Sequence, residues 1–144
     1  MSLRTYLSAL PLCLLALACG APRIEPSRAA AWADAKTAAP ELNVAGTWES
    51  TLGYMSGGWG SGEWIQNGAR IAGGLGPFSV EGRIAGHQAY LVFLSRGKVY
   101  YTAILEMDKE GGLVGLAYTN ALADDPTAQS AEKFPVHLVR PKTS

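Results

Sequence analysis

From residue 43 onward, short runs of alternating apolar and polar residues are separated by glycine-rich turns, a pattern typical of β-strands. It predicts strands at 44–52, 62–66, 70–75, 78–84, 88–94, 99–107, 113–120 and 134–140. The connections are mostly hairpin-sized, such as Asn67-Gly68. Eight strands joined in this way favour a sheet that closes on itself, because closure removes exposed edges. We therefore predict an all-β domain over 43–144, an eight-stranded antiparallel up-and-down β-barrel.

Side-chain direction relates the two ends of this domain. Side chains alternate between the two faces of a strand, so Trp48 points inward in the first strand. In the last strand Arg140 shares the face of Val136 and Leu138, an apolar face on which an arginine needs a partner. The first and last strands become neighbours when the barrel closes. We therefore expect the Arg140 guanidinium to stack on the Trp48 indole.

The combination of Gly46-Thr47-Trp48 near the start and Arg140 near the end resembles the signature of calycins, which include lipocalins and avidins. The resemblance covers most of the domain and implies a lipocalin-like barrel. In calycins the two residues are structural, so Trp48 and Arg140 are expected to close the barrel. The domain is shorter than a typical lipocalin, which leaves less room for a large cavity.

Three of the predicted strands, 88–94, 99–107 and 113–120, are apolar on both faces. One face of each can fill the barrel. The other needs a cover, because a soluble monomer rarely exposes several hundred Å² of contiguous apolar surface. The candidates are the N-terminal segment, the connection 121–133, a second subunit or another partner, and a cover from within the chain is the simplest.

The beginning of the chain reads as an export signal. The stretch 7–18 is mostly apolar and about twelve residues long, which suits a signal peptide but is too short to cross a bilayer. It ends in Leu14-Leu15-Ala16-Leu17-Ala18-Cys19-Gly20, which resembles a bacterial lipobox. The resemblance implies a signal peptide at 1–18 and acylation of Cys19. The alternative is an ordinary secretory signal cut after Ala18.

The residues around the cleavage point also indicate where in the cell the protein is located. Cys13 follows the bulky Leu12 and is expected to leave with the signal, so the mature chain keeps one cysteine. Gly20 stands where an aspartate would imply retention in the inner membrane, so we expect a lipid-anchored protein of the bacterial outer membrane, facing the periplasm or the surface. The lipid would be its only membrane attachment, because no second apolar run is long enough to span.

Charge and composition add two expectations. Removing Arg4 with the signal leaves one basic residue fewer than the 12 acidic ones, so nothing favours nucleic acid as a partner.

Residues 19–42 are rich in alanine, proline and mixed charges, which predicts a flexible tether. Within it, 27–36 is able to form a short helix. Trp32 would then either dock on the barrel or remain exposed.

Few residues of the chain suggest catalysis. His87 falls in a turn and His137 on the outward face of the last strand, without the spacing of a triad or a zinc site. Asp124-Asp125 lie in a polar connection and are expected to cap or to be solvated. We predict neither an enzyme nor a metal or cofactor site.

Binding is more plausible at the loop 53–61, which joins the first two predicted strands. Its glycines surround Tyr54, Met55 and Trp59, large side chains suited to lining an opening or gripping a partner. In calycins this loop covers the ligand mouth. The alternative is that Tyr54 and Trp59 fold back as a plug over a small core.

These observations leave two main hypotheses. The first is a lipoprotein whose barrel binds a small apolar ligand or lipid at its mouth. The second is an envelope interaction module with a filled barrel core, either a subunit of an outer-membrane assembly or an enzyme inhibitor. An enzyme is the third and least favoured class.

Overall fold

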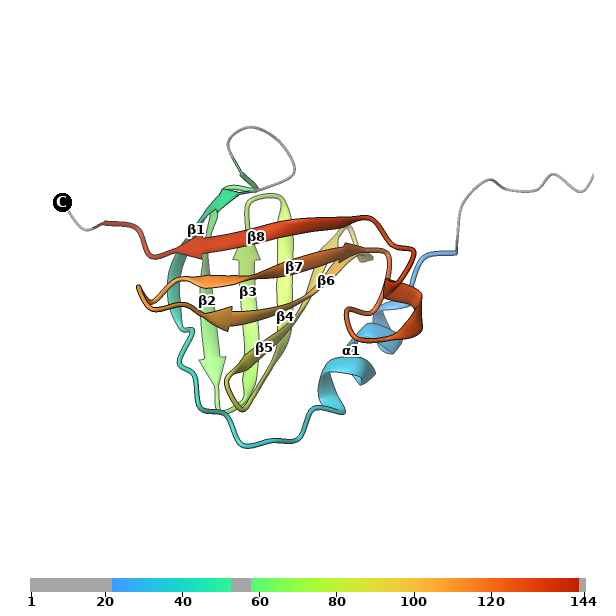
Figure 1. Ribbon diagram of the computed structural model, residues 1–144, viewed down its shortest axis with the longest axis horizontal. Helices are drawn as coiled ribbons and strands as arrows, with labels where there is room; N and C mark the ends of the chain where they lie inside the picture. The colour runs from blue at the N-terminus through green and yellow to red at the C-terminus, as the bar shows by residue number, and fades with distance from the viewer. Residues whose placement is uncertain (1–21, 53–57, 143–144) are drawn as a thin grey trace, which may run out of the picture.

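The computed structural model describes residues 22–52 and 58–142, which form a closed barrel with one helix against its wall (Figure 1). The elements are α1 (Pro26–Asp34), β1 (Gly46–Leu52), β2 (Ser61–Asn67), β3 (Arg70–Leu75), β4 (Phe78–Ala85), β5 (Gln88–Ser95), β6 (Lys98–Met107), β7 (Leu113–Thr119), the 3₁₀ turn η1 (Pro126–Ala128) and β8 (Lys133–Val139). Each strand pairs antiparallel with the next, and β1 pairs with β8. The predicted eight-stranded up-and-down barrel is confirmed.

Inward side chains of all eight strands pack as one continuous core. Trp48, Trp64 and Phe93 are its largest fully buried members. The indole N–H of Trp48 donates to the carbonyl of Val44 (2.8 Å) and that of Trp64 to the carbonyl of Gly74 (2.9 Å), so both polar atoms are satisfied inside the barrel. Large side chains therefore pack inside the barrel, and the two indoles among them make hydrogen bonds there.

The expected contact between the ends of the domain is present. Arg140 follows β8, which pairs with β1, and its Cζ lies 4.3 Å from the centroid of the Trp48 ring. Its Nη1 also donates to the carbonyl of Ala45 (2.8 Å). The guanidinium therefore joins the start of β1 to the end of β8, as the side-chain directions predict.

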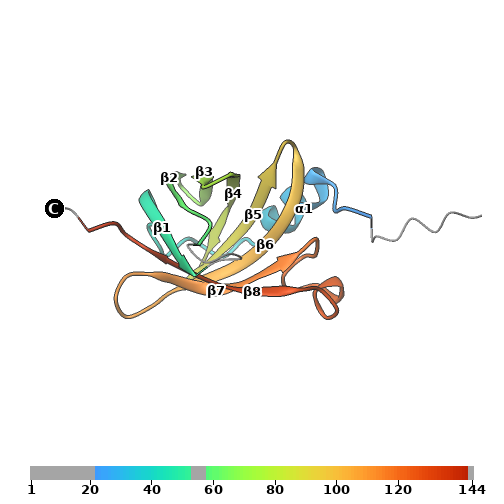
Figure 2. The ribbon, with the colours of Figure 1, turned by 90° about the horizontal axis from the view of Figure 1, so that it is seen from above.

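A second, smaller core lies outside the barrel. Tyr90, Val92 and Val99, from β5 and β6, pack there against α1 and against Leu122 and Ala123 of the connection between β7 and β8. Figure 2 shows α1 running alongside β5 and β6. The apolar outward faces of these strands are thus covered by the N-terminal segment and the 121–133 connection together.

The docked helix corrects the expectation of a flexible tether over 24–36. Of the two interpretations of Trp32, docking is observed: it is 9% exposed, and its indole N–H donates to Oδ1 of Asp124 (2.6 Å). Lys36 forms an ion pair with the same carboxylate, and the backbone N–H of Ile24 donates to Oδ1 of Asn120 (2.8 Å). Composition missed this docking because the surface that holds the segment belongs to strands far along the chain.

Candidate functional site

The barrel mouth is closed by Trp59. This side chain is 7% exposed and stacks on Tyr101, with ring centroids 5.0 Å apart and an interplanar angle of 20°. It meets Phe93 edge-on at 5.0 Å and Phe78 at 5.6 Å. Trp59 thus has the position of a plug. Tyr54 and Met55, the other two predicted binding residues, lie outside the described residues, as does Cys19.

Two buried polar atoms at this end of the barrel lack a hydrogen-bond partner among the described residues. The indole Nε1 of Trp59 and the Oγ1 of Thr119 are buried without a hydrogen-bond partner in the described part of the chain. Thr119 stands opposite Tyr101 across β6 and β7, so both atoms belong to side chains that flank the same ring. An unpaired buried donor or acceptor costs about 1–3 kcal/mol, which makes such atoms uncommon in native proteins.

Gly76, in the turn between β3 and β4, offers a test of how firmly the plug is held. Its φ is +56°, and an added Cβ would lie 1.6 Å from the carbonyl oxygen of Trp59. Gly68 is the matched control, because its φ is +62° and nothing lies within 4 Å of an added Cβ. Gly68→Ala should therefore cost only the left-handed conformation, about 1–2 kcal/mol.

Gly76→Ala should cost that amount plus about 1–3 kcal/mol of overpacking as the Trp59 backbone is displaced. Urea unfolding of the two variants beside the parent gives both losses in free energy of unfolding. Equal losses would mean that the Trp59 segment moves aside freely and is no plug.

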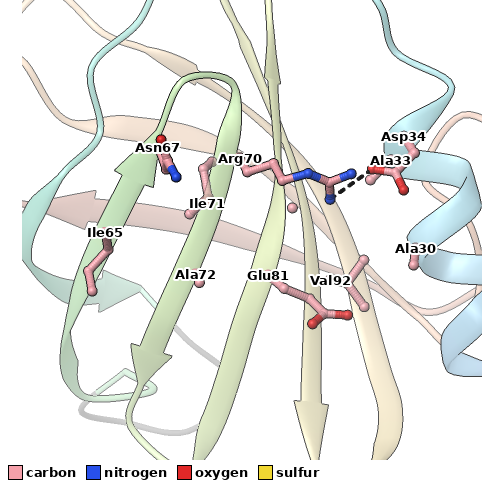
Figure 3. A pocket seen from close by; sticks show the side chains of 11 residues that line it. Ala30, Ala33, Asp34, Ile65, Asn67, Arg70, Ile71, Ala72, Glu81 and Val92 are labelled. Carbon is pink, nitrogen blue, oxygen red and sulfur yellow. Dashed lines mark ion pairs between the residues drawn. The ribbon is translucent and has the colours of Figure 1, made fainter.

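An apolar depression lies on the outer wall of the barrel. This groove has a volume of about 310 Å³ and runs between α1 and the outer faces of β2 to β5 (Figure 3). It is lined by Ala30, Ala33, Asp34, Ile65, Asn67, Arg70, Ile71, Ala72, Glu81, Gly82 and Val92. We call it the wall groove. None of the sequence-predicted binding residues lines it.

The cross-strand register forms the floor of the wall groove. Ile65, Ala72, Glu81 and Val92 stand opposite one another in successive strands and make one row across the sheet. The row changes from covered to open along its length, since Val92 under α1 is 1% exposed and Ile65 is 69% exposed. Ile65 is also more exposed than Leu116 or Met107, the other exposed large apolar side chains of the described chain.

Charged side chains also line the wall groove. Nη1 of Arg70 lies 3.2 Å from Oδ1 of Asp34, and Figure 3 shows the arginine reaching from β3 toward α1 at one end. Glu81 projects from β4 further along the same groove (Figure 3). Both partners of the ion pair are largely exposed, so the pair contributes at most about 1 kcal/mol and leaves the end of the groove adaptable.

Helix α1, which forms one side of the wall groove, is held in place through Asp124. Burial raises the pKa of the Asp124 carboxyl, but the hydrogen bonds from Lys36 and Trp32 lower it more. The pKa of Asp124 therefore lies below the ordinary value for an aspartate. The folded-state pKa is therefore below the unfolded one. The stabilisation that Asp124 contributes is accordingly present above the ordinary pKa and is lost as the pH falls through the lowered value.

A cluster of polar side chains joins β1, β8 and the turn between β6 and β7. Oγ1 of Thr51 lies 2.9 Å from Nδ1 of His137, whose Nε2 lies 3.4 Å from Oδ2 of Asp108. The backbone N–H of Gly112 donates to Asp108 and is the main cause of the lowered pKa of this carboxyl. Sequence spacing did not indicate the carboxylate beside His137, because only the strand register brings the turn next to β8.

This polar cluster has the order hydroxyl, imidazole, carboxylate, but its contacts serve to connect neighbouring strands. Thr51 is exposed, and its hydroxyl also contacts the carbonyl oxygen of His137 (3.3 Å), which keeps it against the strand ladder. His87 has a different partner, with Nε2 3.0 Å from Oε2 of Glu41 on an exposed surface. Over 22–52 and 58–142 no group of three His, Cys, Asp or Glu side chains is placed to hold a metal ion.

No protein family model matches the chain, and neither does any curated protein or solved structure. Among the described residues, no helix has the length and apolar content needed to cross a bilayer. The wall groove and the plugged mouth are the two candidate binding sites of the described chain.

Proposed function

We propose that the protein is a lipid-anchored interaction module of the bacterial outer membrane that binds a protein partner in its wall groove. One observation carries the proposal: the barrel interior is filled with large side chains, whereas an apolar groove stands open on its outer wall. A barrel packed in this way serves as a rigid support for a surface. The proposed location in the outer membrane rests on the lipobox-like segment that contains Cys19.

The wall groove also indicates the chemistry of its partner. Ile65, Ala72 and Ala33 line it with small or aliphatic surface suited to one apolar side chain. Arg70 and Glu81 lie beside that surface with opposite charges, so a partner segment with charged groups on both sides of its apolar residue would pair with both. Exposed apolar side chains with a charged border are typical of interaction sites.

A photo-crosslinking experiment at Ile65 tests this function. We expect p-benzoylphenylalanine at position 65 of the full chain, expressed in bacterial cells, to give one discrete protein adduct on irradiation. The purified adduct partner should then bind Ile65→Asp at least about tenfold more weakly than the parent, since a charge in an apolar contact costs more than about 1.4 kcal/mol.

Leu116 is the matched control, because it is also an exposed aliphatic residue, 41% accessible, and lies on β7 away from the groove. Crosslinker at position 116 should give no such adduct, and Leu116→Asp should bind within about twofold of the parent. The same adducts from both positions, or none from position 65, would reject the wall groove as the binding surface.

A second function, a small apolar ligand or lipid held at the mouth, is favoured by the indole N–H of Trp59, which has no hydrogen-bond partner among the described residues. A ligand with a hydrogen-bond acceptor that entered beside Trp59 and Tyr101 would satisfy that donor. Native mass spectrometry of the protein purified from its own envelope, before and after organic extraction, decides between the two. The filled barrel predicts a bare mass, and an extractable small mass would support the mouth.

A further inference from the structure

The described chain is bound to the barrel almost from its first residue. Nη1 of Arg23 donates to the carbonyl of Val99 (3.2 Å), and its guanidinium lies 4.4 Å from the Tyr100 ring centroid. The side-chain amide of Asn120 donates to the carbonyl of Pro22 (3.1 Å). The chain therefore enters the fold beside the turn between β5 and β6.

This entry point restricts the distance between the barrel and the membrane. Arg23 follows Cys19 by four residues, and four extended residues span at most ~14 Å. If Cys19 carries the lipid, as the proposed function holds, the surface around Arg23 lies within that distance of the headgroups. The barrel is then held against the membrane and not suspended on a long tether.

The surface at this point is locally basic. Arg23, Arg96 and Lys98 are all exposed there, with Glu25 as the acidic neighbour. Arg23 and Lys98 line a shared depression of about 220 Å³. Arg28, one turn into α1, is attracted instead by Asp125. These four side chains, Arg23, Arg96, Lys98 and Glu25, carry a net charge of +2, whereas the whole chain has a formal net charge of 0.

We infer that the surface formed by Arg23, Arg96 and Lys98 rests on anionic lipid headgroups next to the anchor. Lys and Arg side chains near a membrane are attracted by anionic lipids, and the short link to Cys19 keeps them within reach. The lipid and the basic surface are two attachments, which together restrict the rotation of the barrel.

The contact determines which way the wall groove faces. In an up-and-down barrel the turn between β5 and β6 and the turn between β2 and β3 lie at opposite ends. The nine residues of α1 span about 13 Å and carry the chain from Pro26, beside the Arg23 surface, to Asp34, which lies at the Arg70 end of the groove (Figure 3). The Arg70 end of the groove therefore points away from the membrane, toward a partner in the aqueous space.

Chemical labelling of the anchored protein tests this orientation. The chain from Cys19 to Ser144 has Cys19 as its sole cysteine, so it can be coupled to a maleimide lipid in vesicles. We compare vesicles of phosphatidylcholine alone with vesicles that also contain phosphatidylglycerol, and acetylate lysines with a water-soluble reagent. Lys109, in the turn between β6 and β7 at the opposite end, is the internal control.

On the anionic vesicles we expect labelling of Lys98 to fall about fivefold relative to Lys109, the ratio that ~1 kcal/mol of headgroup attraction produces. Arg96→Glu should remove most of that protection, whereas Lys109→Glu, measured with the exposed Lys142 as the reference lysine instead, should leave it intact. Equal labelling of Lys98 on both vesicles, or protection that persists in Arg96→Glu, would overturn the inference. The coupling bypasses acylation in the cell, so this result is independent of whether Cys19 is lipidated in vivo.

Discussion

Replacing Cys19 with serine is expected to release the protein from the membrane completely. Acyl chains contribute about 0.8 kcal/mol for each buried methylene, and two or more chains give stable anchoring. Serine offers no thiol for this attachment. Metabolic labelling with radioactive palmitate, followed by separation of membrane and soluble fractions, should show a labelled membrane protein for the parent and an unlabelled soluble one for Cys19→Ser.

Cys13→Ser is the matched control, because Cys13 is predicted to be removed with the signal peptide. That variant should keep both its label and its membrane location. The alternative, an ordinary secretory signal cut after Ala18, predicts that even the parent is unlabelled and soluble. Label remaining on Cys19→Ser would contradict acylation at this position.

Replacing Trp48 with alanine is expected to cause a large loss of stability. Trp48 is fully buried, its ring centroid lies 5.9 Å from that of Trp64, and it supports the Arg140 guanidinium. Truncating a buried tryptophan costs about 3–5 kcal/mol, because the lost transfer free energy adds to the cost of the cavity. Urea unfolding followed by far-ultraviolet circular dichroism measures the change.

Arg140→Ala separates the two halves of this contact. It leaves the indole buried and removes an exposed cation–π contact and the hydrogen bond to Ala45, so a loss of about 1–2 kcal/mol is expected. If Trp48→Ala fails to fold, Trp48→Phe retains an aromatic ring and should lie between the other two variants. A loss for Arg140→Ala as large as that for Trp48→Ala would show that the arginine, and not the indole, closes the barrel.

The helix α1 links the proposed membrane contact to the wall groove. Its first turn follows the Arg23 entry point, and its last turn supplies Asp34 to the groove. Trp32, between them, is held by Asp124. A change that loosens α1 would therefore affect both the groove wall and the orientation of the barrel.

Most of the fold was predictable from alternation along single strands. The predicted strand 134–140 corresponds to β8 at Lys133–Val139, and the contact between Trp48 and Arg140 followed from which face each occupies. The plug was one of two open interpretations of Trp59, because a glycine-rich loop has no period that assigns a direction. For the outward apolar faces of β5 to β7, the pattern showed that a cover was needed and left four candidates, two of which, the N-terminal segment and the 121–133 connection, form the observed cover.

What the sequence by itself determined is local. Alternation placed each side chain on a face, glycine turns set the hairpins, and an even number of antiparallel strands permitted closure. Only the tertiary structure decided which distant groups meet. It brought α1 and Leu122 over the outer face, Asp108 beside His137, and Ile65 into the wall groove. The physical reason is that periodicity specifies the direction of a side chain, whereas its neighbours depend on strand register and barrel closure, which are properties of the whole chain.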